Sequence, residues 1–176
     1  PRPVGEYAVT IWGRERMYEY FSQQQGTPVA ILRLNYATEL RYGVLVDLAR
    51  KVWQEEPIDL AMGYVNVIWQ RDANAMALAA LRHTRTPPQL LNIAGPLILR
   101  VRDVCERLAE RLNKRLHLVG EEGSDALLND ATWSYGLLGA PQVSPDDMLA
   151  WTAEWVRRGG PLLGKPTHFE SRDGRF

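Results

Sequence analysis

Two short apolar runs, near residues 29–34 and 89–93, dominate the hydrophobic pattern of the chain. Nearly continuous runs of branched apolar residues are typical of strands that are buried on both faces of a parallel sheet. Residues 64–69 (Tyr-Val-Asn-Val-Ile-Trp) also favour a strand. Because two or three short strands would leave open edges, we expect them to belong to a larger sheet that this chain completes only in part.

Between these runs the apolar residues recur at helical spacing. In residues 44–53, Val44, Leu48 and Val52 fall on one stripe, and the charged residues lie mainly elsewhere. Helices are predicted over residues 12–24, 44–53, 72–81, 101–112, 131–138 and 145–157, the last one capped by Ser144. Strands separated by helices predict an α/β fold with a few short strands, about five helices and an incomplete parallel sheet.

The length of 176 residues favours one domain, here residues 1–158. Residues 159–176 are rich in glycine and proline, and we expect an extended C-terminal tail. The chain opens at Pro1 without a methionine, from which we expect an upstream part to be missing.

Composition excludes several kinds of function. Lys plus Arg and Asp plus Glu both total 21, so the net charge of zero predicts no nucleic-acid partner. No apolar run is long enough to predict a membrane span. The three histidines are far apart in sequence and the chain has one cysteine, which predicts no metal site and a reducing, cytoplasmic setting. No glycine-rich phosphate-binding motif is present, so an autonomous cofactor site is not expected.

The order of five segments carries a resemblance to a known family. They are Tyr7-Ala-Val-Thr-Ile-Trp-Gly-Arg-Glu15, Pro28-Val-Ala-Ile-Leu-Arg33, the stretch from Val65-Asn-Val to Asp72-Ala-Asn-Ala, Leu91-Asn-Ile-Ala-Gly-Pro96 and Leu137-Leu-Gly-Ala-Pro141. In this order they resemble the extended short-chain dehydrogenases/reductases of the NAD-dependent epimerase/dehydratase type. The resemblance covers the C-terminal, substrate-binding half and implies part of a Rossmann-like fold for residues 1–158.

The resemblance implies a catalytic role for Tyr7, which matches the tyrosine of the family's Tyr-x-x-x-Lys motif. That tyrosine moves the proton at the reacting carbon–oxygen group, and the lysine lowers its pKa. Here the lysine position holds Ile11, which carries no charge. Arg14 lies two helical turns after Tyr7, so we hypothesise that its guanidinium partly replaces the missing cation. The alternative is that Tyr7 is an ordinary aromatic residue and Arg14 a solvated surface charge.

The same resemblance implies ligand contacts after the first strand and along residues 64–69. Tyr7 and Arg33 are expected beside the cofactor, and the segment after Arg33 closes over the nicotinamide in similar proteins. The candidate substrate-binding residues are Asn35, Tyr36, Arg41, Asn66 and Trp69. Their alternative is a purely structural role, for example in a capped loop before the helix at residues 44–53.

The resemblance implies NAD or NADP as the cofactor of the full-length protein, and none is expected to bind this fragment alone. The expected partners are an upstream dinucleotide-binding half, a small-molecule substrate such as a nucleotide sugar, and further copies in a homo-oligomer. Two other functions stay open. The chain could belong to a non-catalytic NAD(P)-binding sensor or scaffold, since Ile11 replaces the lysine. It could also be a self-contained protein-interaction module.

Overall fold

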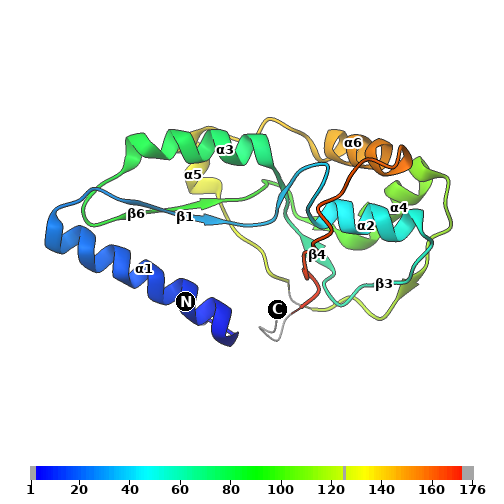
Figure 1. Ribbon diagram of the computed structural model, residues 1–176, viewed down its shortest axis with the longest axis horizontal. Helices are drawn as coiled ribbons and strands as arrows, with labels where there is room; N and C mark the ends of the chain where they lie inside the picture. Colours follow the sequence, from blue (N-terminus) through cyan, green and yellow to red (C-terminus); the bar gives the residue numbers. More distant parts are fainter. Residues whose placement is uncertain (1–2, 125, 172–176) are drawn as a thin grey trace.

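A computed structural model describes residues 3–124 and 126–171, so residues 172–176 of the expected tail lie outside it. The described chain has a mixed α/β fold (Figure 1). Its elements are α1 (Gly5–Gln25), β1 (Ala30–Leu34), β2 (Ala37–Thr38), α2 (Val44–Trp53), β3 (Ile58–Asp59), β4 (Tyr64–Val65), β5 (Ile68–Trp69), α3 (Gln70–Ala79), the 3-10 helix η1 (Ala80–His83), β6 (Gln89–Ile93), β7 (Leu99–Arg100), α4 (Val101–Leu112), β8 (Leu118–Val119), α5 (Thr132–Leu138) and α6 (Pro145–Arg157). The predicted fold class is confirmed.

The two apolar runs pair with each other as a parallel two-stranded sheet. Ala30 of β1 lies opposite Gln89 of β6, and the register continues to Leu34 opposite Ile93. Helix α3 lies on one side of this sheet and α1 on the other (Figure 1). Within the described residues each of these strands pairs only with the other, so each keeps an open edge, as the short runs predicted.

The main hydrophobic core lies between α2, α4 and α6, away from the β1–β6 sheet (Figure 1). Leu45, Leu48, Leu108 and Leu149 are fully buried there. The three predicted ranges 44–53, 101–112 and 145–157 match these helices, because each has a clear apolar stripe. The hydroxyl of Ser144 accepts a hydrogen bond from the backbone N–H of Asp147, which confirms the predicted N-cap of α6.

The predicted strand at residues 64–69 is two strands in different sheets. β4 pairs antiparallel with β7, whereas β5 pairs parallel with β2. Asn66 and Val67 separate them, and the buried Asn66 side chain bonds to neighbouring loops. An alternating pattern shows that both pairs of residues are extended, but it does not show that they have different partners.

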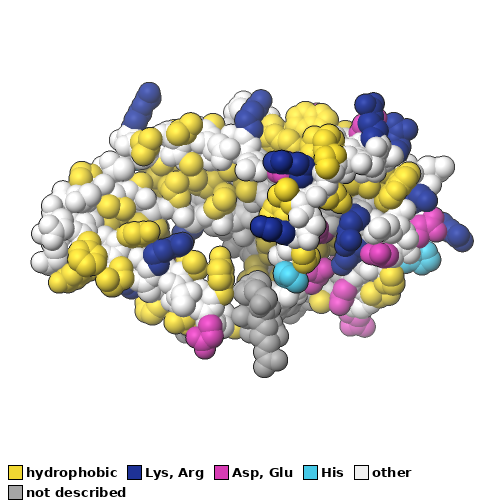
Figure 2. Space-filling view, in the orientation of Figure 1, with side chains coloured by type: hydrophobic (Ala, Val, Ile, Leu, Met, Phe, Trp, Pro, Cys, Tyr) yellow, Lys and Arg dark blue, Asp and Glu magenta, His cyan; other side chains and the backbone are white. Residues whose placement is uncertain are grey.

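Helix α1 begins at Gly5, earlier than the predicted start at Trp12. The sequence of α1 has little amphipathic pattern. Apolar side chains occur on all sides of the helix, and two polar side chains, Glu15 and Ser22, lie on its buried side. Glu15 and Ser22 are buried, while Met17, Tyr20 and Phe21 are exposed. Figure 2 shows hydrophobic side chains gathered on the outer surface of this helix, at the lower left of the view.

Candidate functional site

The candidate site lies where β1 and β6 end. Both strands run in the same direction, so their carboxyl ends meet at one edge of the sheet. The backbone N–H of Asn35, just after β1, donates to the carbonyl of Ile93 at the end of β6 (2.9 Å). In open α/β sheets, ligands bind in the crevice outside the carboxyl ends of the strands. The structure therefore brings the segment that follows β1 to the place where a ligand is expected.

Asparagine side chains connect the loops at this edge. The Asn35 Nδ2 donates to Asn66 Oδ1 at 2.9 Å, so two predicted substrate-binding residues are in direct contact. The Asn66 Nδ2 in turn donates to the carbonyls of Gly95 (3.2 Å) and Asn129 (2.7 Å). Asn66 is only 4% exposed, so its amide holds three chain segments together in a buried setting.

Asn129 is a member of this network that the sequence did not predict. Its backbone N–H donates to Asn66 Oδ1 (3.3 Å), and its Nδ2 donates to the carbonyl of Arg33 (3.2 Å). The partners are 63 and 96 residues away in sequence, and a lone asparagine before a short helix gives no signal of such contacts. We call Asn35, Asn66 and Asn129 the asparagine network.

Gly95 permits the close approach of β6 to the loop between β4 and β5. A Cβ added at Gly95 would lie 1.9 Å from the carbonyl oxygen of Val67, far inside van der Waals contact. A residue without a side chain is therefore required here. Gly95 also supplies the carbonyl that Asn66 binds, so the glycine and the asparagine fix the same edge of the candidate site.

The other predicted substrate residues lie around this edge in different settings. Tyr36 is half-buried, has a left-handed backbone (φ 42°) and accepts a hydrogen bond at its carbonyl from the N–H of Ile68. Burial, together with the negative charge of Glu170, raises the pKa of the Tyr36 hydroxyl. Trp69 stacks edge-on against Trp151, with ring centroids 5.3 Å apart.

The side-chain hydrogen bonds described for Arg41 lie outside the asparagine network. Its guanidinium pairs with Glu39 at 3.1 Å, and its side chain is 55% exposed. The tight turn that carries it is closed by hydrogen bonds between Glu39 and Tyr42. The contact of Arg41 with a substrate stays a prediction.

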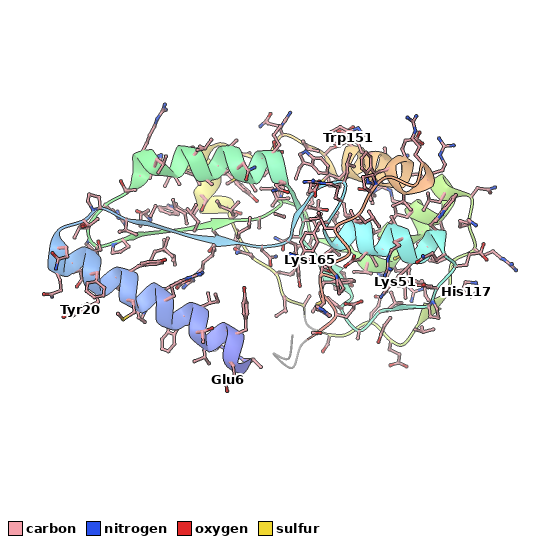
Figure 3. The ribbon with its side chains drawn as sticks, in the orientation of Figure 1. Glu6, Tyr20, Lys51, His117, Trp151 and Lys165 are labelled. Atoms are coloured by element: carbon pink, nitrogen blue, oxygen red, sulfur yellow. The ribbon has the colours of Figure 1, made fainter. Side chains whose placement is uncertain are left out.

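The predicted catalytic residues lie on α1. Tyr7 is 61% exposed and Arg14 is exposed, while Ile11 between them is half-buried. Figure 3 labels Glu6 at the end of α1 that lies toward the middle of the molecule and Tyr20 at the opposite end. Tyr7 follows Glu6, so it lies at the end of α1 nearer the middle. Its catalytic role and that of Arg14 stay predictions.

Arg33 joins β1 to α1 through a paired carboxylate. Its Nε and Nη2 donate to the two oxygens of Glu15 at 2.9 and 2.6 Å, a bidentate arrangement. The hydrogen bond from Arg33 lowers the pKa of Glu15 despite the opposing effect of burial. The guanidinium of this predicted cofactor-binding residue is therefore directed toward α1, and its carbonyl toward Asn129.

Breaking this pair is expected to destabilise the protein. Arg33→Met leaves the Glu15 carboxylate, whose side chain is 8% exposed, without its partner. We expect a loss of about 2 kcal/mol in urea unfolding at pH 7, below the range for fully buried pairs because the Arg33 side chain is 35% exposed. Arg33→Met with Glu15→Leu is expected to recover most of the loss.

The pH dependence provides a second check of the same pair. A carboxylate with a lowered folded-state pKa contributes stability above its ordinary pKa, about 4.3, and this contribution is lost as the pH falls through the folded-state pKa. The difference in the free energy of unfolding between wild type and Arg33→Met should therefore be largest at neutral pH and should decrease as the pH falls through the folded-state pKa of Glu15. A difference that is constant from pH 7 to pH 3 would contradict this assignment.

Metal and thiol chemistry have no support in the part of the chain that the structure describes. No group of three or more His, Cys, Asp or Glu side chains could hold a metal ion there. Cys105 is buried in α4, and burial raises its pKa to about 12, so its thiol is not an activated nucleophile. None of the described helices combines the length and hydropathy that a membrane crossing requires.

Comparison with solved structures identifies the fold. UDP-glucuronic acid 4-epimerase from Bacillus cereus, in complex with NAD, matches with a TM-score of 0.76 and 19% identity over 90% of this chain and 52% of that chain. UDP-glucose 4-epimerase from Thermotoga maritima, with UDP-glucose, matches with a TM-score of 0.75 and 20% identity, and the match covers 90% of this chain and 55% of that chain. RMD from Pseudomonas aeruginosa, complexed with NADPH, matches with a TM-score of 0.74 and 16% identity, and the match covers 90% of this chain and 58% of that chain.

This chain has part of the short-chain dehydrogenase/reductase fold. The predicted resemblance to NAD-dependent epimerases is thereby confirmed at the level of structure. The chain spans little more than half the length of these short-chain dehydrogenase/reductase structures. No protein-family model matches the chain, and no curated protein does.

Proposed function

We propose that this chain is the substrate-binding part of an NAD(P)-dependent epimerase/dehydratase-like oxidoreductase. The observation that carries the proposal is the asparagine network at the carboxyl ends of β1 and β6. It places polar side chains where Rossmann-like folds bind ligands. The structures with the same fold contain NAD, NADPH or a nucleotide sugar, which supports this ligand class.

An upstream half would supply the rest of the sheet and the site for the dinucleotide. The residues present fit only one side of such a site, because the chain has no glycine-rich turn and Ile11 replaces the lysine. Leu32 and Leu34 of β1 are 37% and 56% exposed, and the outer edge of β1 has no partner among the described residues. The unpaired backbone groups of this edge are suited to a further parallel strand, and the exposed Leu32 and Leu34 lie on a face that further chain would cover, which supports the proposal of a missing half.

The proposed roles follow from position. Tyr7 would hold or move the proton at the reacting oxygen, with Arg14 as the nearby cation, and a bound nicotinamide would accept the hydride. The proposed substrate contacts are Asn35, Tyr36, Arg41 and Trp69, and Arg33 belongs to the cofactor side. Asn66, proposed from the sequence as a substrate contact, is buried with its amide bonded to Asn35, Gly95 and Asn129, so it would act on the substrate by positioning Asn35. A nucleotide sugar is the proposed substrate class, since its hydroxyl groups can exchange hydrogen bonds with amide side chains.

The first test compares the complete protein with the 176-residue chain. Calorimetry and protein fluorescence should detect NAD or NADP binding by the complete protein and none by the chain alone. Binding by the 176-residue chain would contradict the division of the site between two halves. Absence of binding by either would overturn the proposed function and would favour a protein-interaction module.

A second candidate function is a dinucleotide-binding sensor or scaffold without turnover. The replacement of the lysine by Ile11 favours it, because an uncharged side chain supplies no positive charge one turn after Tyr7. The two functions differ in one measurement. Substrate-dependent reduction of bound nicotinamide, followed by its absorbance, is expected for the enzyme and not for the sensor.

We also infer that the complete protein forms a homo-oligomer. The outer surface of α1 exposes large apolar side chains, including Val9 (45%), Met17 (53%) and Phe21 (50%). Exposed apolar surface of this extent is typical of contact with another protein surface. Light scattering of the complete protein should give more than one copy, and a monomer would contradict the inference.

A further inference from the structure

Residues 160–171, here called the strap, run back from the end of α6 along α2. The start of the strap is fixed by Trp155, whose Nε1 donates to the carbonyl of Pro161 (3.2 Å). Gly160 lies against the same indole, since an added Cβ would be 2.2 Å from the ring. Farther along, the N–H of Leu163 donates to the carbonyl of Arg41 (3.1 Å), in the turn before α2.

Two polar contacts fix the rest of the strap to α2. The backbone N–H and the hydroxyl of Thr167 both donate to Asp47 Oδ2 at 2.8 Å. One turn later, Lys51 Nζ lies 2.9 Å from a carboxylate oxygen of Glu170. Figure 3 shows Lys51 on α2 and labels Lys165 of the strap beside the start of this helix.

Phe169 lies between these two polar contacts and is 2% exposed. Its side chain belongs to the main core, together with residues of α2, α4 and α6. Burial of a whole aromatic side chain contributes a few kcal/mol, more than an exposed ion pair. The strap is therefore anchored in the core and is not merely laid along the surface.

The strap contacts the connection between β1 and α2, residues 35–43, which includes the short strand β2 and is here called loop 35–43. Leu163 binds the carbonyl of Arg41, and Tyr36 packs against the core cluster that contains Phe169. The backbone of Tyr36 is in the left-handed region, which is unfavourable for a residue with a side chain and persists only where its surroundings hold it. Since this loop carries three predicted substrate residues, the strap lies beside the candidate site.

We propose that the strap is a positioning element of the substrate site: by seating Phe169 in the core and Glu170 on Lys51, it holds loop 35–43 in its ligand-binding conformation. This inference rests on the proposed function. It assigns the strap to the substrate side of the crevice and not to the dinucleotide side. Loosening the strap should therefore weaken substrate binding selectively.

The test uses a charge reversal in the complete protein. Lys51→Glu places two carboxylates together at the Glu170 contact. We expect amide hydrogen exchange of residues 36–42 to become about tenfold faster and the affinity for UDP-glucose to fall about tenfold. The affinity for NAD should change less than about twofold. Lys51→Glu with Glu170→Lys should restore both properties, and Thr167→Val, a milder change, should move them in the same direction.

Lys114→Glu is the matched control. Lys114 forms a longer half-buried contact with Glu55 (3.9 Å) and lies over the ring of Trp53 (4.9 Å to its centroid). Neither Lys114 nor Glu55 touches the strap or loop 35–43 in the contacts that the structure describes. This control should leave exchange of residues 36–42 and UDP-glucose affinity unchanged.

Three results would overturn the proposal. Unchanged exchange of residues 36–42 in Lys51→Glu would show that the strap does not hold the loop. A parallel loss of UDP-glucose and NAD affinity would show general destabilisation. Failure of the charge swap to restore the loop would exclude the Lys51–Glu170 contact as the cause. If wild-type complete protein binds neither ligand, the proposed function fails, and hydrogen exchange still decides whether the strap holds the loop.

Discussion

Replacing Gly95 with alanine is expected to destabilise the protein by about 3 kcal/mol and to disrupt the candidate site. The new Cβ would lie 1.9 Å from the Val67 carbonyl oxygen and 2.7 Å from its carbonyl carbon. Both atoms are backbone, so no flexible side chain can move aside. Relief of the overlap requires β6 to separate from the loop between β4 and β5, which stretches the hydrogen bond from Asn66 to Gly95.

The matched control is Gly13→Ala in the middle of α1. No atom lies within 4 Å of an added Cβ there. Alanine in an exposed helical position is more favourable than glycine by about 0.5–1 kcal/mol, so this variant should be slightly more stable. Urea unfolding of the complete protein measures both variants. Equal stabilities for Gly95→Ala and wild type would mean that the close approach at Val67 is absent in solution.

Gly95 also gives a physical reason for one part of the sequence resemblance. It belongs to Leu91-Asn-Ile-Ala-Gly-Pro96, which matched the family's segment on pattern alone. The structure shows that the glycine allows two chain segments to approach, and that its carbonyl accepts the Asn66 amide. Gly95 in this segment therefore allows the end of β6 to approach the loop between β4 and β5, in addition to any role in a turn.

The elements that the sequence predicted well are those with a local signal. Helices α2, α4 and α6 each have an apolar stripe and a recognisable end, and their predicted ranges agree with the structure. Helix α1 has no such stripe, because Glu15 and Ser22 face the sheet, and its start was predicted too late. Its buried side is polar because Glu15 pairs with Arg33, a partner that lies in another element.

The parts of the site that could not be predicted depend on contacts between distant segments. Asn35 and Asn66 were candidates only through the resemblance, and their mutual hydrogen bond spans 31 residues. Asn129 had no signal, and the sequence predicted the strap only as part of an extended tail, without its contacts to α2. A single asparagine or phenylalanine in a loop has many possible partners, and only the folded chain selects one of them.

Tyr7→Phe is expected to lower the turnover of the complete protein about 100-fold while leaving NAD affinity nearly unchanged. The change removes one hydroxyl from an exposed aromatic ring, so the fold should not be affected. Without that hydroxyl no proton can be held or moved at the reacting oxygen by this residue. Steady-state kinetics with UDP-glucose or another nucleotide sugar, together with NAD titration, provide the measurement.

Tyr18→Phe is the control for Tyr7→Phe, because it removes the same hydroxyl from the same helix. Tyr18 follows Tyr7 by 11 residues, three helical turns, so both lie on nearly the same face. Their exposures are also similar, 51% and 61%. Only Tyr7 lies at the end of α1 toward the middle of the molecule, so Tyr18→Phe should retain full turnover. Equal activities of the two variants would exclude Tyr7 as the acid/base residue and would favour the sensor, since Ile11 already leaves the tyrosine without its usual cation.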